Sequence, residues 1–267
     1  MDGVVVVAAC DKNMPGAVMA MARLNIPSVF VYGGAILPGN FRGKDINIQD
    51  MYEAVGAYSQ GSLSLDDLIG MEKVACPGEG ACAGMFTANT MSTAIEALGM
   101  SLPGAASIPA VDSRNDEVAY SIGKTMYHLL KEDIKPRDIM TKDSFENAIK
   151  VVLSMGGSTN SVLHLLAIAH EAKVNISIDD FDRLSRSTPY ITDLRPGGKY
   201  VMSDVDKVGG VKVLMKELLS AGILKGDVMT VTGKTLQENL SNVKIKPDGK
   251  VIYNVSSPRS NTGGLVI

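Results

Sequence analysis

The chain has 267 residues, of which 45% are hydrophobic and 21% are charged, as in an ordinary globular protein. Its formal net charge of −3 gives no electrostatic reason to expect binding to nucleic acid or to an anionic membrane. No apolar stretch approaches the roughly 18 residues of a membrane-spanning helix, and three cysteines are too few for a disulfide framework. We therefore expect a cytoplasmic protein in a reducing compartment, without a nucleic-acid or membrane partner.

The first 35 residues predict a strand, a helix and a second strand. Residues 4–9 are a continuous apolar run, residues 15–24 are expected to be helical, and residues 29–32 form a second apolar run. Pro15 suits the first turn of the helix. Apolar runs without alternation are typical of a parallel sheet that helices cover on both faces.

Three side chains of different chemistry follow the first predicted strand, namely Cys10, Asp11 and Lys12. A thiolate is a good ligand for a soft metal centre, and a carboxylate binds hard cations such as Mg²⁺. A lysine held out of water can become neutral and reactive. A buried cysteine followed by a solvated Asp–Lys pair would produce the same sequence, so the tripeptide alone leaves both interpretations open.

Helical periodicity recurs through most of the chain up to about residue 220. Ser64 is expected to cap one helix, because its hydroxyl can accept a hydrogen bond from a free N–H group of the first turn. The helices that we expect after the second strand span residues 47–60, 64–74, 85–98, 113–131, 142–154, 160–172, 178–186 and 203–220.

A glycine-rich loop at residues 76–84 carries Cys76 and Cys82 and leads into a predicted helix. Glycines let a backbone approach a ligand closely, and a helix N-terminus attracts negative charge. A thiolate at Cys82 would be stabilised there. The alternative is a tight loop with a buried free cysteine. The two cysteines are too far apart in sequence for a common zinc motif, so they need not share a metal.

A second loop of small residues, at 156–160, also leads into a predicted helix. Its side chains Ser158, Thr159 and Asn160 are candidates for binding a substrate carboxylate or phosphate. A plain capped helix, with Ser158 or Asn160 as the cap, fits this loop equally well. The stretch at 193–200, with two cations and two glycines, is expected to be a solvated loop.

The pattern changes near residue 226, where strands are expected at 227–231 and 251–254. The predicted fold is therefore α/β, with a parallel sheet flanked by helices over residues 1–225 and the start of a β-rich second domain over 226–267. Because the chain enters one predicted strand almost at once and stops within another, we expect both domains to be incomplete.

Taken in order, these motifs resemble the family of dihydroxyacid, phosphogluconate and sugar-acid dehydratases. No single motif identifies the family, but their order does, and segments 193–200 and 232–235 extend the similarity over nearly the whole chain. The resemblance rests on Cys10-Asp11-Lys12-x-x-Pro15-Gly16, on Cys76-Pro77-Gly78-x-Gly80-x-Cys82-x-Gly84-Met85-x-Thr87-Ala88-Asn89-Thr90-Met91, and on Gly156-Gly157-Ser158-Thr159-Asn160.

The resemblance implies two cofactors. Cys10 and Cys82 match two of the three cysteines that hold an iron–sulfur cluster, of the 2Fe–2S or 4Fe–4S type. Asp11 matches a Mg²⁺ ligand, and Lys12 matches a lysine that binds Mg²⁺ after carbamylation, which requires a neutral amine of the kind that burial produces. Cys76 matches a position that is not a cluster ligand in the family.

The reaction implied by the resemblance is loss of water from a 2,3-dihydroxy acid to give a 2-keto acid, as in valine and isoleucine synthesis, by a homodimer. The family's third cluster cysteine, two further Mg²⁺ ligands and catalytic serine have no counterpart in this sequence. We therefore expect the chain alone to be inactive. Two alternatives remain open: a dehydratase of sugar acids such as gluconate, arabinonate or phosphogluconate, and a non-redox α/β module that binds anions or nucleotides. A further, simpler interpretation is that the chain by itself is a structural remnant that folds but has no activity.

Overall fold

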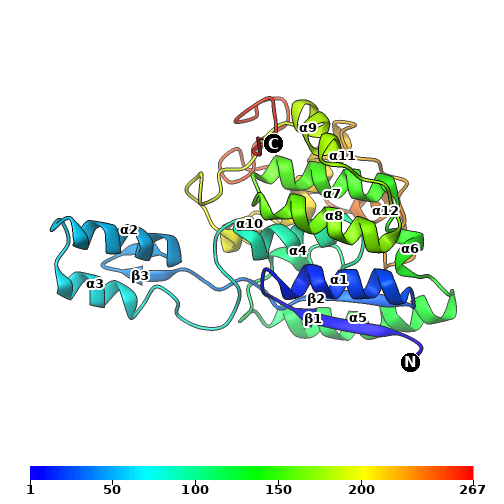
Figure 1. Cartoon of the computed structure of the whole chain (residues 1–267), viewed down its shortest axis with the longest axis horizontal. Coiled ribbons are helices and arrows are strands. Elements are labelled where there is room, and N and C mark those ends of the chain that lie inside the picture. Colours follow the sequence, from blue (N-terminus) through cyan, green and yellow to red (C-terminus); the bar gives the residue numbers. More distant parts are fainter. Residues whose placement is uncertain (267) are drawn as a thin grey trace.

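A small parallel sheet lies between helices in the computed structural model, which describes residues 1–266 (Figure 1). The sheet pairs β1 (Val4–Ala8) with β2 (Ser28–Tyr32). Helix α1 (Asn13–Leu24) connects the strands and packs on one face, and α5 (Arg114–Lys131) packs on the other. The predicted α/β fold with a parallel sheet flanked by helices is confirmed.

Helices cover both faces of the sheet, but one side of β1 remains open. The burial of its side chains alternates, and Val5 and Val7 are 47% and 68% exposed. Among the strands of residues 1–266, β1 pairs only with β2, so it is an edge strand. Since α1 covers one of its faces, every second valine points away from the described part of the molecule.

The segment between β2 and the glycine-rich loop forms an arm that projects from the body of the molecule (Figure 1). It contains a short antiparallel pair, β3 (Gly39–Phe41) and β4 (Lys44–Ile46), which the sequence analysis missed. Two expected helices follow, α2 (Ile48–Ser59) and α3 (Leu65–Glu72). Ser64 caps α3, as predicted, by accepting a hydrogen bond from a backbone N–H group.

Helix α4 (Thr87–Ala97) runs through the centre of the body and is buried along its whole length. It packs against α7 (Lys142–Met155), α8 (Asn160–Ala172) and α1, and these elements share one hydrophobic core. Helices α1 and α8 pack side by side and run in the same direction. An ion pair of 2.6 Å between Arg23 and Glu171 joins their C-terminal ends, and Asp11 and Lys12 lie near His164 at their N-terminal ends. Their N-termini therefore lie at the same edge of the molecule.

The single helix expected at 203–220 is wrong. The structure has two helices there, α10 (Met202–Lys207) and α11 (Val211–Ser220). Gly209 and Gly210 separate them with φ angles of 108° and 84°, which an α-helix does not allow.

The remaining helices complete the body of the molecule. None of the helices in residues 1–266 is long and apolar enough to cross a membrane. The helices not yet described are the short helix α6 (Pro136–Ile139), α9 (Ile178–Ser187), α12 (Leu236–Leu240) and the 3₁₀ turn η1 (Ala105–Ser107).

The strands expected at 227–231 and 251–254 do not form within the described residues. Each contributes one isolated bridge, from Met229 to Thr235 and from Ile252 to Thr192. At the first of them the residue opposite Met229 is Thr235, the N-cap of the helix at 236–240, so the chain becomes helical and the pairing does not extend. The division into domains at residue 226 stays a prediction.

Glu96, near the end of α4, is a buried carboxyl group without an ion-pair partner in the described part of the chain. It is 3% exposed and accepts hydrogen bonds from the N–H groups of Gly104 and Ala106, at 2.7 and 2.8 Å. Burial raises the pKa of Glu96 from 4.5 to about 7, against the opposing effect of these two hydrogen bonds. The folded protein therefore binds this proton more tightly than the unfolded chain does.

We expect this group to make the protein less stable as the pH rises. The stabilisation that the protonated Glu96 carboxyl group provides is complete below pH 4.5 and is lost as the pH rises through 7. The rise in the pKa of Glu96 from 4.5 to about 7 corresponds to about 3 kcal/mol of unfolding free energy. Urea unfolding at several pH values should therefore show a loss of stability between pH 5 and pH 8 that is much smaller in Glu96→Gln. Equal slopes for the two proteins would contradict the raised pKa.

Candidate functional site

Three loops that are far apart in the sequence meet at one edge of the molecule. Residues 10–12 lead into α1, the glycine-rich loop leads into α4, and the loop at 156–160 leads into α8 (Figure 1). The N-termini of α1 and α8 lie at the same edge, and Thr87, the first residue of α4, forms hydrogen bonds with Ser158 and Asn160 there, so the three helix N-termini lie together. The positive ends of the helix dipoles make this edge favourable for negative charge.

Side-chain hydrogen bonds join the loop at 156–160 to the first turn of α4. The Asn160 side chain donates to the hydroxyl of Thr87 at 2.9 Å, and the hydroxyls of Ser158 and Thr87 lie 3.0 Å apart. The N–H group of Ser158 donates to Thr90 at 2.9 Å. Thr159 is exposed beside them. The predicted residues Ser158, Thr159 and Asn160 are thus brought next to the loop that carries Cys82.

The tripeptide Cys10-Asp11-Lys12 forms a local polar group at the start of α1. The Lys12 ammonium lies 2.8 Å from the Asp11 carboxylate, and the Cys10 thiol donates to the other oxygen of Asp11 at 3.5 Å. The hydrogen bond from Lys12 is the main reason that the pKa of Asp11 lies below its usual range. The Lys12 side chain is 67% exposed, so the described residues do not supply the burial that a neutral lysine requires.

Cys82 has other acidic groups close by. Partial desolvation of the thiol within the glycine-rich loop is the main cause that raises its pKa, and the neighbouring Cys10, Cys76 and Asp11 raise it further. The expected stabilisation of a thiolate by the helix N-terminus is therefore outweighed, because Cys82 lies several residues before α4 and beside other acids. A bound cation would favour the deprotonated form of the Cys82 thiol, and thiols beside a carboxylate are donor types that fit a metal centre.

The described residues do not complete a metal site by themselves. Within residues 1–266, no three His, Cys, Asp or Glu side chains converge closely enough to hold a metal ion. All three cysteines are free and exposed, and Cys76 and Cys82 line the same cavity of about 270 Å³. The chain thus brings thiols and a carboxylate to one edge without enclosing them.

The loop at 193–200, which we expected to be solvated, instead packs against the glycine-rich loop. Its Asp193 is only 7% exposed, and the carbonyl of Arg195 accepts a hydrogen bond of 2.8 Å from the N–H group of Met85. The Arg195 guanidinium also forms an ion pair with Asp50 of α2. This loop therefore connects the base of the arm to the loop that carries Cys82, through contacts that no local sequence pattern signals.

Sequence reasoning also missed His164 as a neighbour of the tripeptide. It lies on the second turn of α8, is 7% exposed, and its Nε2 atom has no hydrogen-bond partner in the described part of the chain. Burial lowers the pKa of His164, the charge of Lys12 lowers it further, and Asp11 opposes the change. A neutral imidazole therefore lies near Asp11 and Lys12.

Comparison with known proteins identifies close relatives. The family described as dihydroxy-acid/6-phosphogluconate dehydratase N-terminal matches residues 1–239. Over its whole length, the chain is 55% identical to a dihydroxy-acid dehydratase of Sulfurisphaera tokodaii and 56% identical to one of Acidothermus cellulolyticus. It is 52% identical to dihydroxy-acid dehydratase 2 of Staphylococcus saprophyticus. These alignments cover 48%, 48% and 47% of the relatives, so the chain spans about half the length of the curated relatives it matches.

Proposed function

The chain belongs to the dihydroxy-acid/6-phosphogluconate dehydratase family, and we propose that it contributes half of the active site of a dihydroxy-acid dehydratase. The proposed reaction removes water from a 2,3-dihydroxy acid to give a 2-keto acid, as in valine and isoleucine synthesis. The observation that carries the proposal is the meeting of residues 10–12, Cys82 and the loop at 156–160 at one edge.

Within the proposed active site, this chain would bind the carboxylate of the substrate. The positive end of the α8 dipole and the polar side chains of Ser158, Thr159 and Asn160 would attract that carboxylate. The N–H groups of Asn160, Ser161 and Val162 are already hydrogen-bonded within the loop. Thr87 and Thr90 hold this loop in place through the hydrogen bonds described above. A carboxylate bound there would direct the two hydroxyls of the substrate toward the cysteine and aspartate side chains.

We propose that Cys10 and Cys82 supply two ligands of an iron–sulfur cluster, and that Asp11 and carbamylated Lys12 bind Mg²⁺. The cluster would supply a Lewis acid for the leaving hydroxyl, and Mg²⁺ would supply positive charge for the carboxylate and the C2 oxygen. To become a ligand, the neutral Lys12 amine forms a bond to the carbon of CO₂ and releases a proton. We propose that parts of the full-length protein beyond these residues, in a homodimer, provide the missing burial.

The 267 residues alone are expected to show no turnover, because Cys10, Asp11 and Lys12 are open to water and the described residues form no closed ligand set. The proposed function is tested on full-length protein with dihydroxyisovalerate, gluconate and phosphogluconate as substrates and 2-keto acid as the measured product. We expect dihydroxyisovalerate to have the highest kcat/KM. Preference for gluconate or phosphogluconate would identify a sugar-acid dehydratase instead.

We expect Asp11→Asn to weaken Mg²⁺ binding by the full-length protein by about tenfold or more, because a neutral amide replaces a charged oxygen ligand. The measurement is a Mg²⁺ titration by calorimetry. Asp2→Asn, near the other end of the same strand, is a control that should leave the affinity unchanged. Unchanged Mg²⁺ affinity in Asp11→Asn would remove Asp11 from the proposed metal site.

A further inference from the structure

Asn89 connects the two sides of the loop that carries Cys82. It lies in the first turn of α4 and is 0% exposed. Its side-chain N–H groups donate to the carbonyl of Cys82 and, at 2.6 Å, to the carbonyl of Gly84. Its side-chain oxygen accepts a hydrogen bond of 2.6 Å from the hydroxyl of Tyr32. Both N–H groups and the oxygen of this amide are therefore engaged.

Tyr32 links this loop to the strand that leads to Cys10. It is the last residue of β2, is 4% exposed, and lies opposite Ala8 in the parallel ladder, two residues before Cys10. Burial is the main cause that raises the pKa of Tyr32, and the thiols of Cys82 and Cys10 add to it. The hydroxyl thus remains a donor, which keeps the oxygen of Asn89 toward Tyr32 and its N–H groups toward the loop.

We propose that Tyr32 and Asn89 are positioning residues that hold Cys82 at a fixed place relative to Cys10, so that both thiols can bind one cluster. This inference rests on the proposed function, which assigns a cluster to the two cysteines. A cluster requires its ligands at set separations, and a loop held in advance loses less freedom when the cluster binds. The Tyr32–Asn89 hydrogen bond connects α4 to β2, and β2 pairs with the strand that leads to Cys10.

Asn89→Asp is the sharpest variant for testing this role. The carboxylate has the same shape and still accepts from Tyr32, but it cannot donate to the two carbonyls and repels them instead. We expect the loop to shift and the cluster to be lost to an iron chelator about ten times faster or more. Tyr32→Phe removes only the hydroxyl and should give a smaller acceleration, of about threefold.

The experiment uses full-length protein reconstituted anaerobically with iron and sulfide. Wild type, Asn89→Asp, Tyr32→Phe and the double variant are compared for iron content, visible spectrum, reduction potential and rate of iron loss. Thr93→Val is the matched control, since Thr93 is buried on the same helix and its hydroxyl has no partner in the described residues. The double variant should lose iron less rapidly than the two single accelerations combined would predict. Both substitutions interrupt the same path, which runs from Tyr32 through Asn89 to the loop that carries Cys82.

The outcomes separate this role from a purely structural one. Unfolding temperatures that fall while iron content, spectrum and iron-loss rate remain those of wild type would overturn the proposal. Tyr32→Phe keeps the buried ring, so it decides the question if Asn89→Asp does not fold. A wild-type protein that takes up no iron would refute the proposed cluster itself, whereas a stable cluster in every variant would refute only the positioning role.

Discussion

Replacing Cys82 with serine is expected to remove the iron–sulfur cluster from the full-length protein, leaving less than about a tenth of the wild-type iron. A serine hydroxyl is a poor ligand for iron because it does not ionise near neutral pH, whereas a thiolate binds soft metals well. Cys10→Ser should have the same effect, since the Cys10 thiol lies close enough to raise the pKa of Cys82. Anaerobic iron and sulfide analysis with a visible spectrum measures the result.

Cys76→Ser is the matched control for these two variants. Cys76 is also free and exposed, and it lines the same cavity as Cys82. We expect it to retain the cluster, because the family resemblance assigns no ligand role to this position. A protein that holds its full iron content without Cys82 would contradict the proposed ligand. If the wild type were also free of iron, the anion-binding alternative would become the better interpretation.

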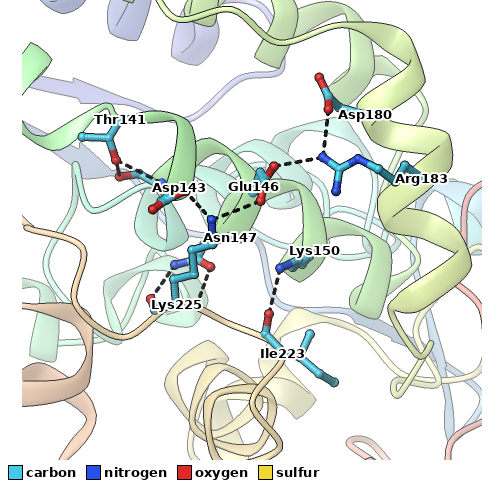
Figure 2. A network of polar contacts seen from close by, with 10 residues as sticks. Thr141, Asp143, Glu146, Asn147, Lys150, Asp180, Arg183, Ile223 and Lys225 are labelled. Atoms are coloured by element: carbon cyan, nitrogen blue, oxygen red, sulfur yellow. Dashed lines mark hydrogen bonds and ion pairs between the residues drawn. The ribbon is translucent and has the colours of Figure 1, made fainter.

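Asn147→Ala is expected to cost about 3 kcal/mol of unfolding free energy. Asn147 lies on α7, is 0% exposed, and forms two hydrogen bonds with the backbone of Lys225, at 2.8 and 2.9 Å. Figure 2 shows this contact beside the Lys150 ammonium, which donates to the carbonyl of Ile223 at 2.9 Å. Alanine would leave a backbone N–H and a carbonyl of Lys225 unpaired in a poorly hydrated place. Chemical denaturation of the variant and of wild type measures the loss.

A charged neighbour on the same helix provides the comparison. Asp143 forms an ion pair with the Lys225 ammonium, but the two side chains are 48% and 41% exposed (Figure 2). We expect Asp143→Asn to cost less than about 1 kcal/mol, because water screens exposed ion pairs. If Asp143→Asn destabilised the protein as much as Asn147→Ala, the surface charges rather than the buried backbone contacts would hold the 223–225 segment to α7.

Local chemistry made much of the fold predictable from the sequence. The apolar run before Cys10 and the run that ends at Tyr32 form the expected parallel strands, and Ser64 caps the helix that it was expected to cap. Such features depend on neighbours a few residues away, which the sequence displays directly. The break at Gly209 was missed because helical periodicity continues on both sides of it.

The residue types of the candidate site were also determined by the sequence, since Cys10, Asp11, Lys12 and Cys82 occur in recognisable motifs. Their arrangement was decided only by the tertiary structure. The Tyr32–Asn89 hydrogen bond joins residues 57 positions apart, and the Arg195–Asp50 ion pair joins residues 145 apart. Contacts over such distances depend on how the helices pack, because packing sets which side chains meet. The sequence therefore determined which chemical groups this protein carries, and helix packing decided which of them lie together.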